Sequence, residues 1–320
     1  MTNQIEHDFR QVNTADVSTQ FLSSSSIEVI AEFKPTAALR HVLFDFDGTL
    51  SLVREGWTEI MVPMMVEYLS ETNTDESPKQ LSGICSEFVM ELTGKQTIYQ
   101  MIRLAEEIRQ RGGTPLDPLA YKDDYHHRLM EQIESRREHL RTGQVPPTEM
   151  VVPGSFELLN LLRDHDVQMY LASGTDEQYV REEVELLQLG DYFGRHVYGA
   201  QEDYKAFSKA QVIQNILADN QVDGATLLGF GDGYVEIQNV RDVGGTAIAV
   251  ASDETARSGR PDEWKRERLI AAGAHAVVPD YQDAGRLIEW LWNVSQESTH
   301  ALSPTRPISG PHGPAQLEGE

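Results

Sequence analysis

The sequence contains almost no cysteine and comparatively few basic residues. Cys85 is the single cysteine among 320 residues, so no disulfide can form within the chain. Secreted domains are often rich in disulfides, and we therefore expect a cytoplasmic protein. Asp and Glu number 51 against 27 Lys and Arg, which gives a formal net charge of −24. Nucleic-acid-binding proteins usually carry a basic patch or stripe, and the sequence has none, so we expect no nucleic-acid partner.

Long apolar runs are also missing. A membrane-spanning helix needs about 20 predominantly apolar residues, and no segment approaches that length. The first residues lack the basic start and apolar stretch of a signal peptide. We therefore expect no membrane association. The excess of acid also means that any site for a phosphate ester must be made locally positive by a cation, a lysine or helix N-termini.

Short apolar runs alternate with amphipathic helical patterns over much of the chain. The runs predict strands at residues 41–44, 167–172, 225–229, 246–250 and 274–278, with a weaker one at 196–198. The helical patterns lie at residues 156–164, 176–187, 209–218 and 264–272. This alternation is typical of an α/β fold, a Rossmann-like doubly wound parallel sheet with helices on both faces.

Residues 52–147 interrupt this alternation, because they contain only helical patterns. Leu81, Cys85 and Phe88, for example, recur at helical spacing. We predict that this interval forms an all-helical cap domain inserted into an α/β core domain. The core domain then comprises residues 39–51 and 148–295.

The two ends of the chain differ from the rest in composition. Residues 1–38 are polar and lack a sustained period, so we predict a flexible extension with at most one short strand near 27–33. Residues 296–320 are rich in Pro, Gly and Ser. They cannot bury enough apolar surface to offset their ordering entropy, and we predict a disordered tail.

Reactive side chains follow three of the predicted strands. Asp45 and Asp47 come directly after the first strand, Ser173 after the second and Asp232 after the third. Lys209 opens one of the predicted helices. Because ligands bind beyond the carboxyl ends of parallel strands, we expect these side chains to converge at one edge of the sheet.

This set of groups suits phosphoryl transfer. A Mg²⁺ ion held by carboxylate oxygens, with Asp232 completing its shell, would offset the charge of a phosphate. Asp45 could then attack the phosphorus and form an aspartyl-phosphate, while Asp47 protonates the departing oxygen. Ser173 and Lys209 could hold the phosphoryl oxygens as negative charge spreads over them.

Four strings in order, FDFDGTL, LASGT, SKAQVIQNIL and GFGDGYVEI, resemble the four motifs of the haloacid dehalogenase-like hydrolase superfamily. The resemblance extends over residues 40–278. The inserted helices are similar to the cap of the branch that contains phosphoglycolate phosphatase and β-phosphoglucomutase. Members that cleave carbon–halogen bonds lack an aspartate two residues after the nucleophile, so Asp47 favours phosphoryl transfer.

The resemblance implies a role for each matched residue. Asp45 is the expected nucleophile and a magnesium ligand, Asp47 is the general acid/base and binds the metal through its backbone carbonyl, and Asp232 is a further ligand. The residues expected to bind phosphate are Thr49, Ser173, Gly174 and Lys209.

Two positions depart from the family pattern or leave a choice. Glu236 stands where the fourth motif often has aspartate, and we expect it in the outer shell of the metal. The third motif offers both Lys205 and Lys209, and Lys209 is preferred because it begins the amphipathic helix. In the cap interval, Arg54 and Lys95 are candidates for substrate specificity, although an exposed linker lysine is an equally good interpretation of Lys95.

We therefore expect a Mg²⁺-dependent phosphatase that acts on a small phosphorylated metabolite, such as a sugar phosphate or phosphoglycolate. A phosphomutase or phosphotransferase that uses the same aspartyl-phosphate is the alternative, because it differs only in the acceptor. A non-catalytic metabolite sensor is a third hypothesis, which the presence of all three aspartates disfavours.

Overall fold

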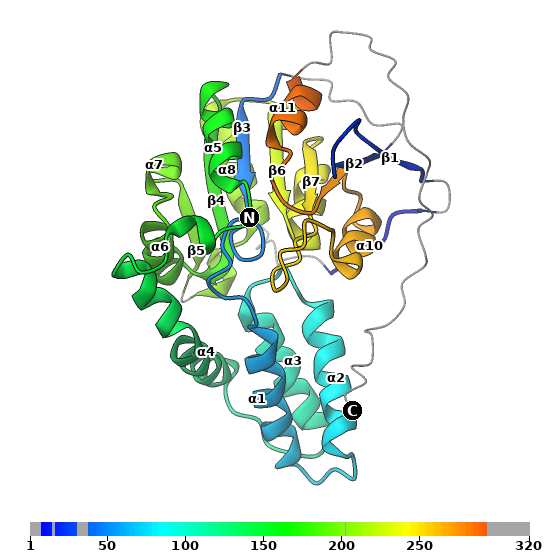
Figure 1. Ribbon diagram of the computed structural model, residues 1–320. Helices are drawn as coiled ribbons and strands as arrows, with labels where there is room; N and C mark the ends of the chain where they lie inside the picture. Colours follow the sequence, from blue (N-terminus) through cyan, green and yellow to red (C-terminus); the bar gives the residue numbers. More distant parts are fainter. Residues whose placement is uncertain (1–7, 15–16, 31–37, 202, 293–320) are drawn as a thin grey trace.

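The computed structural model describes residues 8–14, 17–30, 38–201 and 203–292. Figure 1 shows two parts, a sheet with its covering helices at the top and a group of helices below it. The lower helices follow strand β3 (His41–Phe44), and the chain then returns to the sheet. The ends of the parallel strands therefore lie between the two parts.

One eight-stranded sheet forms the upper part, in the order β1-β2-β8-β7-β6-β3-β4-β5. From β8 to β5, each strand runs parallel to its neighbour. Besides β3, the parallel strands are β4 (Gln168–Asp176), β5 (Val197–Ala200), β6 (Leu227–Gly231), β7 (Thr246–Val250) and β8 (Ala276–Val278). The predicted fold class, a doubly wound and mostly parallel sheet with an inserted helical segment, is confirmed.

Helices cover both faces of the sheet, and successive strand residues point to opposite sides. Val42 and Phe44 pack with one layer of helices and Leu43 with the other. The first layer consists of α5 (Ser155–Asp164), α6 (Glu177–Leu186), α7 (Gly190–Phe193) and α11 (Ala284–Trp292). The second consists of α8 (Lys209–Asn220), α9 (Tyr234–Asp242) and α10 (Glu263–Ala271). Burial on both faces explains the continuous apolar runs in the sequence.

The register of the sheet brings three strand ends together. Phe44, the last residue of β3, pairs with Leu171 on β4 and with Phe230 on β6. The residues that follow these positions therefore emerge at the same edge. β6 begins two residues later than predicted, because Gly224–Thr226 form a 3-10 turn, which the Asp223 side chain caps by accepting a hydrogen bond from the Ala225 N–H.

Four helices form the cap below this edge. They are α1 (Thr58–Ser70), α2 (Pro78–Glu91), α3 (Thr97–Gln110) and α4 (Pro118–Arg141). Local sequence fixes two of their starts: Ser77 and Gln80 form a capping box at α2, and Asp117 caps α4. The side chains that the helical spacing identified, including Leu81, Cys85 and Phe88, are buried in the cap interior.

The described part of the N-terminal extension contains two strands, one of which lies within the predicted short strand at 27–33, whereas the rest of residues 17–30 was predicted to be flexible. Strands β1 (Thr19–Phe21) and β2 (Glu28–Ile30) form an antiparallel hairpin that pairs with the edge of β8. The buried carboxylate of Glu28 accepts two hydrogen bonds of 2.5 Å from Arg266 on α10 and one from Thr19. This ion pair offsets the cost of burying the Glu28 charge. The hairpin could not be predicted from periodicity, because each of its strands has only three residues.

Other predictions for the chain ends lie outside the described residues, namely positions 31–33 of the predicted strand and the whole of 296–320.

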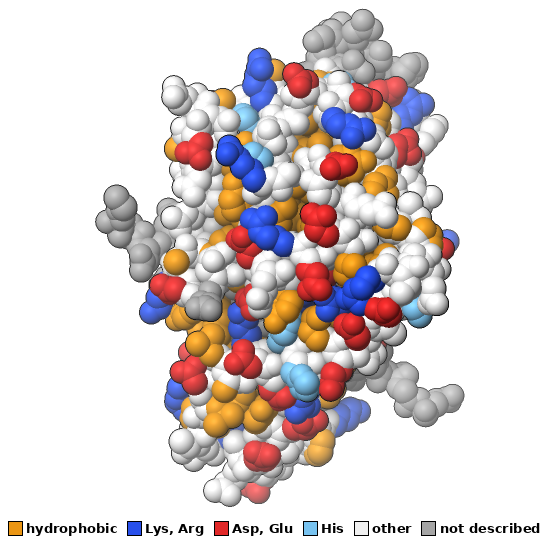
Figure 2. All heavy atoms as spheres, turned by 90° about the vertical axis from the view of Figure 1, so that its left-hand side faces the viewer, with side chains coloured by type: hydrophobic (Ala, Val, Ile, Leu, Met, Phe, Trp, Pro, Cys, Tyr) orange, Lys and Arg blue, Asp and Glu red, His pale blue; other side chains and the backbone are white. Residues whose placement is uncertain are grey.

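On the face shown in Figure 2, acidic and basic side chains are interspersed over the side that includes α4 and α6. In the part of the chain that the structure describes, no helix combines the length and the apolar character needed to cross a bilayer.

Candidate active site

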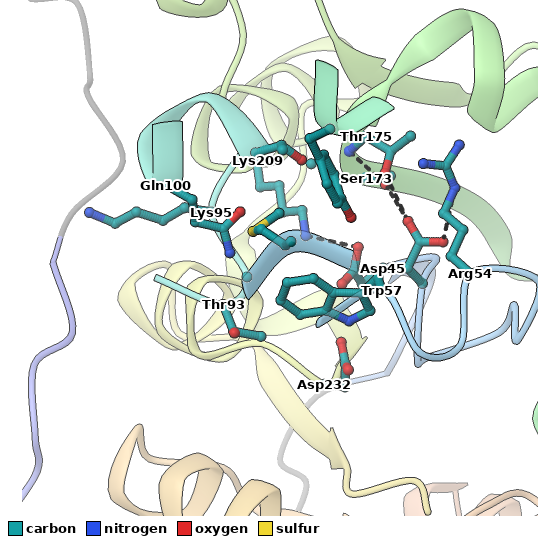
Figure 3. Close-up of a pocket in the computed structure, with 16 residues that line it drawn as sticks. Asp45, Arg54, Trp57, Thr93, Lys95, Gln100, Ser173, Thr175, Lys209 and Asp232 are labelled. Atoms are coloured by element: carbon teal, nitrogen blue, oxygen red, sulfur yellow. Dashed lines mark hydrogen bonds and ion pairs between the residues drawn. The ribbon is translucent and has the colours of Figure 1, made fainter. Parts of the chain in front are cut away.

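Side chains from distant segments line one cavity between the sheet edge and the cap (Figure 3). Its volume is about 100 Å³. The residues predicted from the sequence that line it are Asp45, Asp47, Arg54, Lys95, Ser173, Gly174, Lys209 and Asp232. The cap interval adds aromatic and polar groups, among them Trp57, Gln100 and Tyr125. Two predicted residues, Thr49 and Glu236, do not line the cavity.

Asp45 lies directly after β3, where its backbone N–H donates to the Phe230 carbonyl at 2.9 Å. The side chain is buried, and its Oδ1 accepts a hydrogen bond of 2.8 Å from Lys209 Nζ. Burial raises the pKa of the Asp45 carboxyl, the Lys209 charge opposes this shift, and the Asp232 charge adds to it. Lys209 is thus the neighbour that favours the charged form of this buried carboxyl.

Lys209 is the first residue of α8, and its side chain is buried beneath the cavity. Its amine contacts both Asp45 and Glu236. Lys205, the other candidate from the third motif, is exposed, and its amine lies 5.5 Å from the centre of the Tyr204 ring. The structure therefore brings Lys209, and not Lys205, to Asp45. The second carboxylate oxygen of Glu236 is buried and has no hydrogen-bond partner among the described residues.

Asp47 lies on the other side of Asp45, against the end of β4. Its Oδ2 accepts a hydrogen bond of 2.9 Å from Thr175 Oγ1, and Ser173 Oγ lies 3.5 Å from the same oxygen. Burial raises the pKa of Asp47 to about 7, even though the Arg54 charge lowers it. A carboxyl group that titrates near neutrality can both give and take a proton, as an acid/base catalyst must. Oδ1 is buried and accepts no hydrogen bond in the described chain.

Arg54 stands beside Asp47, with its Nε 3.7 Å from Asp47 Oδ1. Its guanidinium donates three hydrogen bonds to Glu183 on α6: Nε donates to Oε2 at 3.0 Å and to Oε1 at 3.2 Å, and Nη2 donates to Oε1 at 2.8 Å. Both side chains are buried, with exposed fractions of 7% and 0%. Arg54 was predicted from its proximity to the first motif, whereas Glu183 was missed because it lies 129 residues away on a helix.

Gly48 and Thr49 shape the turn after β3. The φ angle of Gly48 is +73°, and a Cβ atom at this position would overlap with Asp232 Oδ2. Thr49 was predicted to bind phosphate, but it is fully buried behind the cavity. There its Oγ1 accepts a hydrogen bond of 3.0 Å from the Asp232 N–H. Thr49 therefore holds the Asp232 turn in place.

Asp232, directly after β6, completes the group of carboxylates. Figure 3 shows one of its carboxylate oxygens directed toward Asp45. The other, Oδ2, accepts a hydrogen bond of 2.9 Å from Lys265 on α10. Lys265 was missed by the sequence analysis, because it lies 33 residues further along the chain in a helix with no motif.

The oxygen donors of this group fit a magnesium ion. Asp45 and Asp232 offer carboxylates, Asp47 can offer its backbone carbonyl, and Mg²⁺ prefers such hard oxygen ligands. Figure 3 shows the two carboxylates facing each other, and a cation between them would relieve the repulsion that contributes to the raised pKa of Asp45. Among the described residues, no three His, Cys, Asp or Glu side chains group as metal ligands. The expected set needs only two side-chain carboxylates, with the carbonyl and water as further ligands.

The cap also contacts the core next to the cavity, through the loop between α2 and α3. Gly94 in the loop between α2 and α3 packs against Gly233, and a Cβ on Gly174 would lie 2.9 Å from the Lys95 carbonyl oxygen. Gln96 donates hydrogen bonds of 3.1 and 2.9 Å to the carbonyls of Tyr204 and Phe207. These contacts of the backbone explain why glycine stands on both sides of the cap–core junction.

Lys95 does not present its amine to the carboxylates. Its backbone lines the cavity, but its side chain points away from Asp45 in Figure 3. The amine pairs with Asp8 at 2.6 Å and lies 5.3 Å from the centre of the Tyr99 ring. Of the two interpretations of Lys95, the exposed linker lysine is wrong, because the side chain is only 4% exposed. The role in substrate specificity stays a prediction.

Comparisons with known proteins place this geometry in a family. The profile of the haloacid dehalogenase-like hydrolases matches residues 39–244. Among solved structures, a predicted phosphatase from Clostridium acetobutylicum is similar, with a TM-score of 0.53 and 18% identity over 79% of this chain and 100% of the other. A hydrolase of family IA, variant 3, from Entamoeba histolytica gives a TM-score of 0.50 at 15% identity over 79% and 99%.

A candidate β-phosphoglucomutase from Bacteroides vulgatus gives a TM-score of 0.51 at 15% identity, over 82% of this chain and 92% of the other. At these identities the likeness establishes the fold alone. No curated protein matches the chain. The profile match, in contrast, spans more than half of the chain and includes every strand end that builds the cavity. The chain therefore belongs to the haloacid dehalogenase-like hydrolases, in the branch with a helical cap.

Proposed function

We propose that the protein is a Mg²⁺-dependent phosphatase that hydrolyses a small phosphorylated metabolite, such as a sugar phosphate or a phosphoglycolate-like ester, through an aspartyl-phosphate on Asp45. The observation that carries this proposal is the meeting of Asp45, Asp47, Asp232 and Lys209 around one cavity. The small volume of the cavity, about 100 Å³, favours a small substrate.

In the first step, a carboxylate oxygen of Asp45 attacks the phosphorus, and the bond between phosphorus and the ester oxygen breaks. Asp47 donates a proton to that oxygen as it leaves, so the leaving group departs as a neutral alcohol. Lys209 and the Ser173 hydroxyl stabilise the charge on the phosphoryl oxygens. When bound by Asp45, Asp232 and the Asp47 carbonyl, Mg²⁺ would supply the positive charge that lets one anion approach another.

In the second step, Asp47 accepts a proton from a water molecule, which attacks the phosphorus of the aspartyl-phosphate. The bond from phosphorus to Asp45 breaks, so the carboxylate is restored and inorganic phosphate is released. The pKa of about 7 suits Asp47 to both directions of transfer. Thr175 and Arg54 keep its carboxylate in one orientation through the second step.

Release of phosphate from p-nitrophenyl phosphate tests this proposal. We expect turnover with Mg²⁺, loss of turnover with a chelator, and a fall of about a thousand-fold or more in kcat for Asp45→Asn. Asp219→Asn, at an exposed position near the end of α8, is the matched control and should keep full activity. Full activity of Asp45→Asn would refute the mechanism. Isomerisation of sugar phosphates with little release of phosphate would instead identify a mutase.

A further inference from the structure

Lys265 lies behind Asp232, on the side away from the cavity. Its Nζ donates to Asp232 Oδ2 at 2.9 Å, to Glu254 Oε1 at 2.6 Å and to Ser252 Oγ at 3.2 Å. Ser252 in turn donates a hydrogen bond of 2.6 Å to the carbonyl of Gly48. An ammonium group has three N–H donors, so Lys265 has an acceptor for each of them. Its side chain is also only 12% exposed. The amine is therefore held in one position.

Glu254 brings a further carboxylate to the back of the magnesium site. A Cβ built on Gly48 would overlap with Asp232 Oδ2 and would lie 3.0 Å from Glu254 Oε1, so both oxygens face the same small space above the turn. Lys265 is the cation that separates them. Glu254 Oε1 thus lies beside the Asp232 carboxylate, and Lys265 engages an oxygen of each group.

Divalent ions differ in how they would respond to this arrangement. Mg²⁺ keeps octahedral geometry and several water ligands, and it is commonly held by one or two carboxylates. Ca²⁺ accepts six to eight oxygen ligands in flexible geometry and gains from additional carboxylates. A site with few protein carboxylates and a fixed ammonium behind one of them therefore favours the smaller ion.

We propose that Lys265 is a positioning residue that sets the ion selectivity of the site, because it keeps Glu254 out of the metal shell. This inference rests on the proposed function, in which a divalent ion binds between Asp45 and Asp232. Lys265 acts through Asp232 and Glu254 and does not touch the substrate. Both Lys265 and Glu254 lie outside residues 39–244, the range that matches the family profile. The proposed control of ion selectivity therefore depends on residues that the profile does not include.

The test measures ion binding without turnover. Dissociation constants for Mg²⁺ and Ca²⁺ are determined by isothermal titration calorimetry for the wild type, Lys265→Met and Lys265→Met/Glu254→Gln. In Lys265→Met, we expect the affinity for Ca²⁺ to rise relative to Mg²⁺ by about ten-fold or more, a typical size for effects of residues that contact metal ligands. In the double variant the ratio should return to the wild-type value, because the added ligand is gone.

Lys205→Met is the matched control, since this lysine is exposed and lies outside the cavity. It should leave both constants unchanged. If Lys265→Met fails to fold, Lys265→Gln replaces it, because glutamine retains hydrogen-bond donors while removing the charge.

Two results would overturn the proposal: a ratio of Ca²⁺ to Mg²⁺ affinity within two-fold of the wild type in the single variant, or a gain that persists without Glu254. A wild-type protein that binds neither ion would instead refute the proposed magnesium-dependent function.

Discussion

Replacing Glu183 with methionine tests how much the buried ion pair between Arg54 and Glu183, next to Asp47, contributes to stability. The side chains of Arg54 and Glu183 are 7% and 0% exposed, so solvent screens their ion pair little. Removing one partner of a buried pair typically costs about 3–5 kcal/mol, because the other charge stays buried without compensation. In Glu183→Met, Arg54 still has Asp47 at 3.7 Å. We therefore expect a loss near the lower end, about 3 kcal/mol of unfolding free energy.

The variant Arg54→Met/Glu183→Met provides the decisive comparison. Apolar residues of similar size often replace a buried ion pair with little change in stability. The double variant should therefore be more stable than Glu183→Met, and the coupling energy between the two positions should be about 2 kcal/mol or more. Phosphatase activity should be lower in the double variant than in the wild type, because Asp47 has lost its neighbouring guanidinium.

Urea unfolding, followed by circular dichroism for the wild type, both single variants and the double variant, gives the four free energies. Single variants within about 0.5 kcal/mol of the wild type, the range of ordinary surface substitutions, would show that the pair is unimportant for stability. Losses that simply add in the double variant would show that the two side chains do not act as a pair.

Three further outcomes follow from individual residues. Gly48→Ala should abolish activity, while Gly112→Ala should leave it intact. The two glycines have similar φ angles, +73° and +74°, but only at Gly48 would a Cβ overlap with Asp232. Equal activities of the two variants would refute this reasoning. Burial raises the pKa of the Cys85 thiol from 9.0 to about 12, so the native protein should react with a thiol reagent about 1,000-fold more slowly than the unfolded protein. Burial, together with the Arg241 charge, lowers the pKa of His275 to about 3, so its contribution to stability is complete above pH 6.5 and is lost as the pH falls. Between pH 6.5 and 4, the wild type should lose about 3 kcal/mol more unfolding free energy than His275→Gln; parallel curves would contradict this.

Sequence alone predicted the sheet and the residues at its edge because both depend on local rules. Strands buried on both faces leave continuous apolar runs, and the carboxyl ends of parallel strands meet at one edge. Asp45 and Ser173 stand directly after such a run and Asp232 three residues after one, so their convergence follows from topology. Lys209 could be preferred over Lys205 for a similar reason, because the start of an amphipathic helix faces that edge.

The partners of these residues could not be predicted in the same way. Glu183 and Lys265 are ordinary charged residues of helices in the sequence, and only the packing of α6 and α10 against the core brings them to Arg54 and Asp232. Thr49 was assigned to phosphate because it belongs to the first motif, whereas its hydroxyl faces the Asp232 backbone. The direction of the Lys95 side chain likewise depends on a contact with Asp8, 87 residues away.

The pairing of β2 with β8 sets a limit on how far this protein can be shortened. A fragment that comprises only residues 39–244 would end before β7, so β6 would become an unpaired edge strand of the sheet. A fragment that starts at residue 38 would keep β7 and β8, but the edge of β8 that pairs with β2 would be exposed. Arg266 would also lose its ion pair with Glu28. Exposed edge strands pair with other chains, so both fragments should aggregate under conditions in which a fragment of residues 17–292 remains in solution.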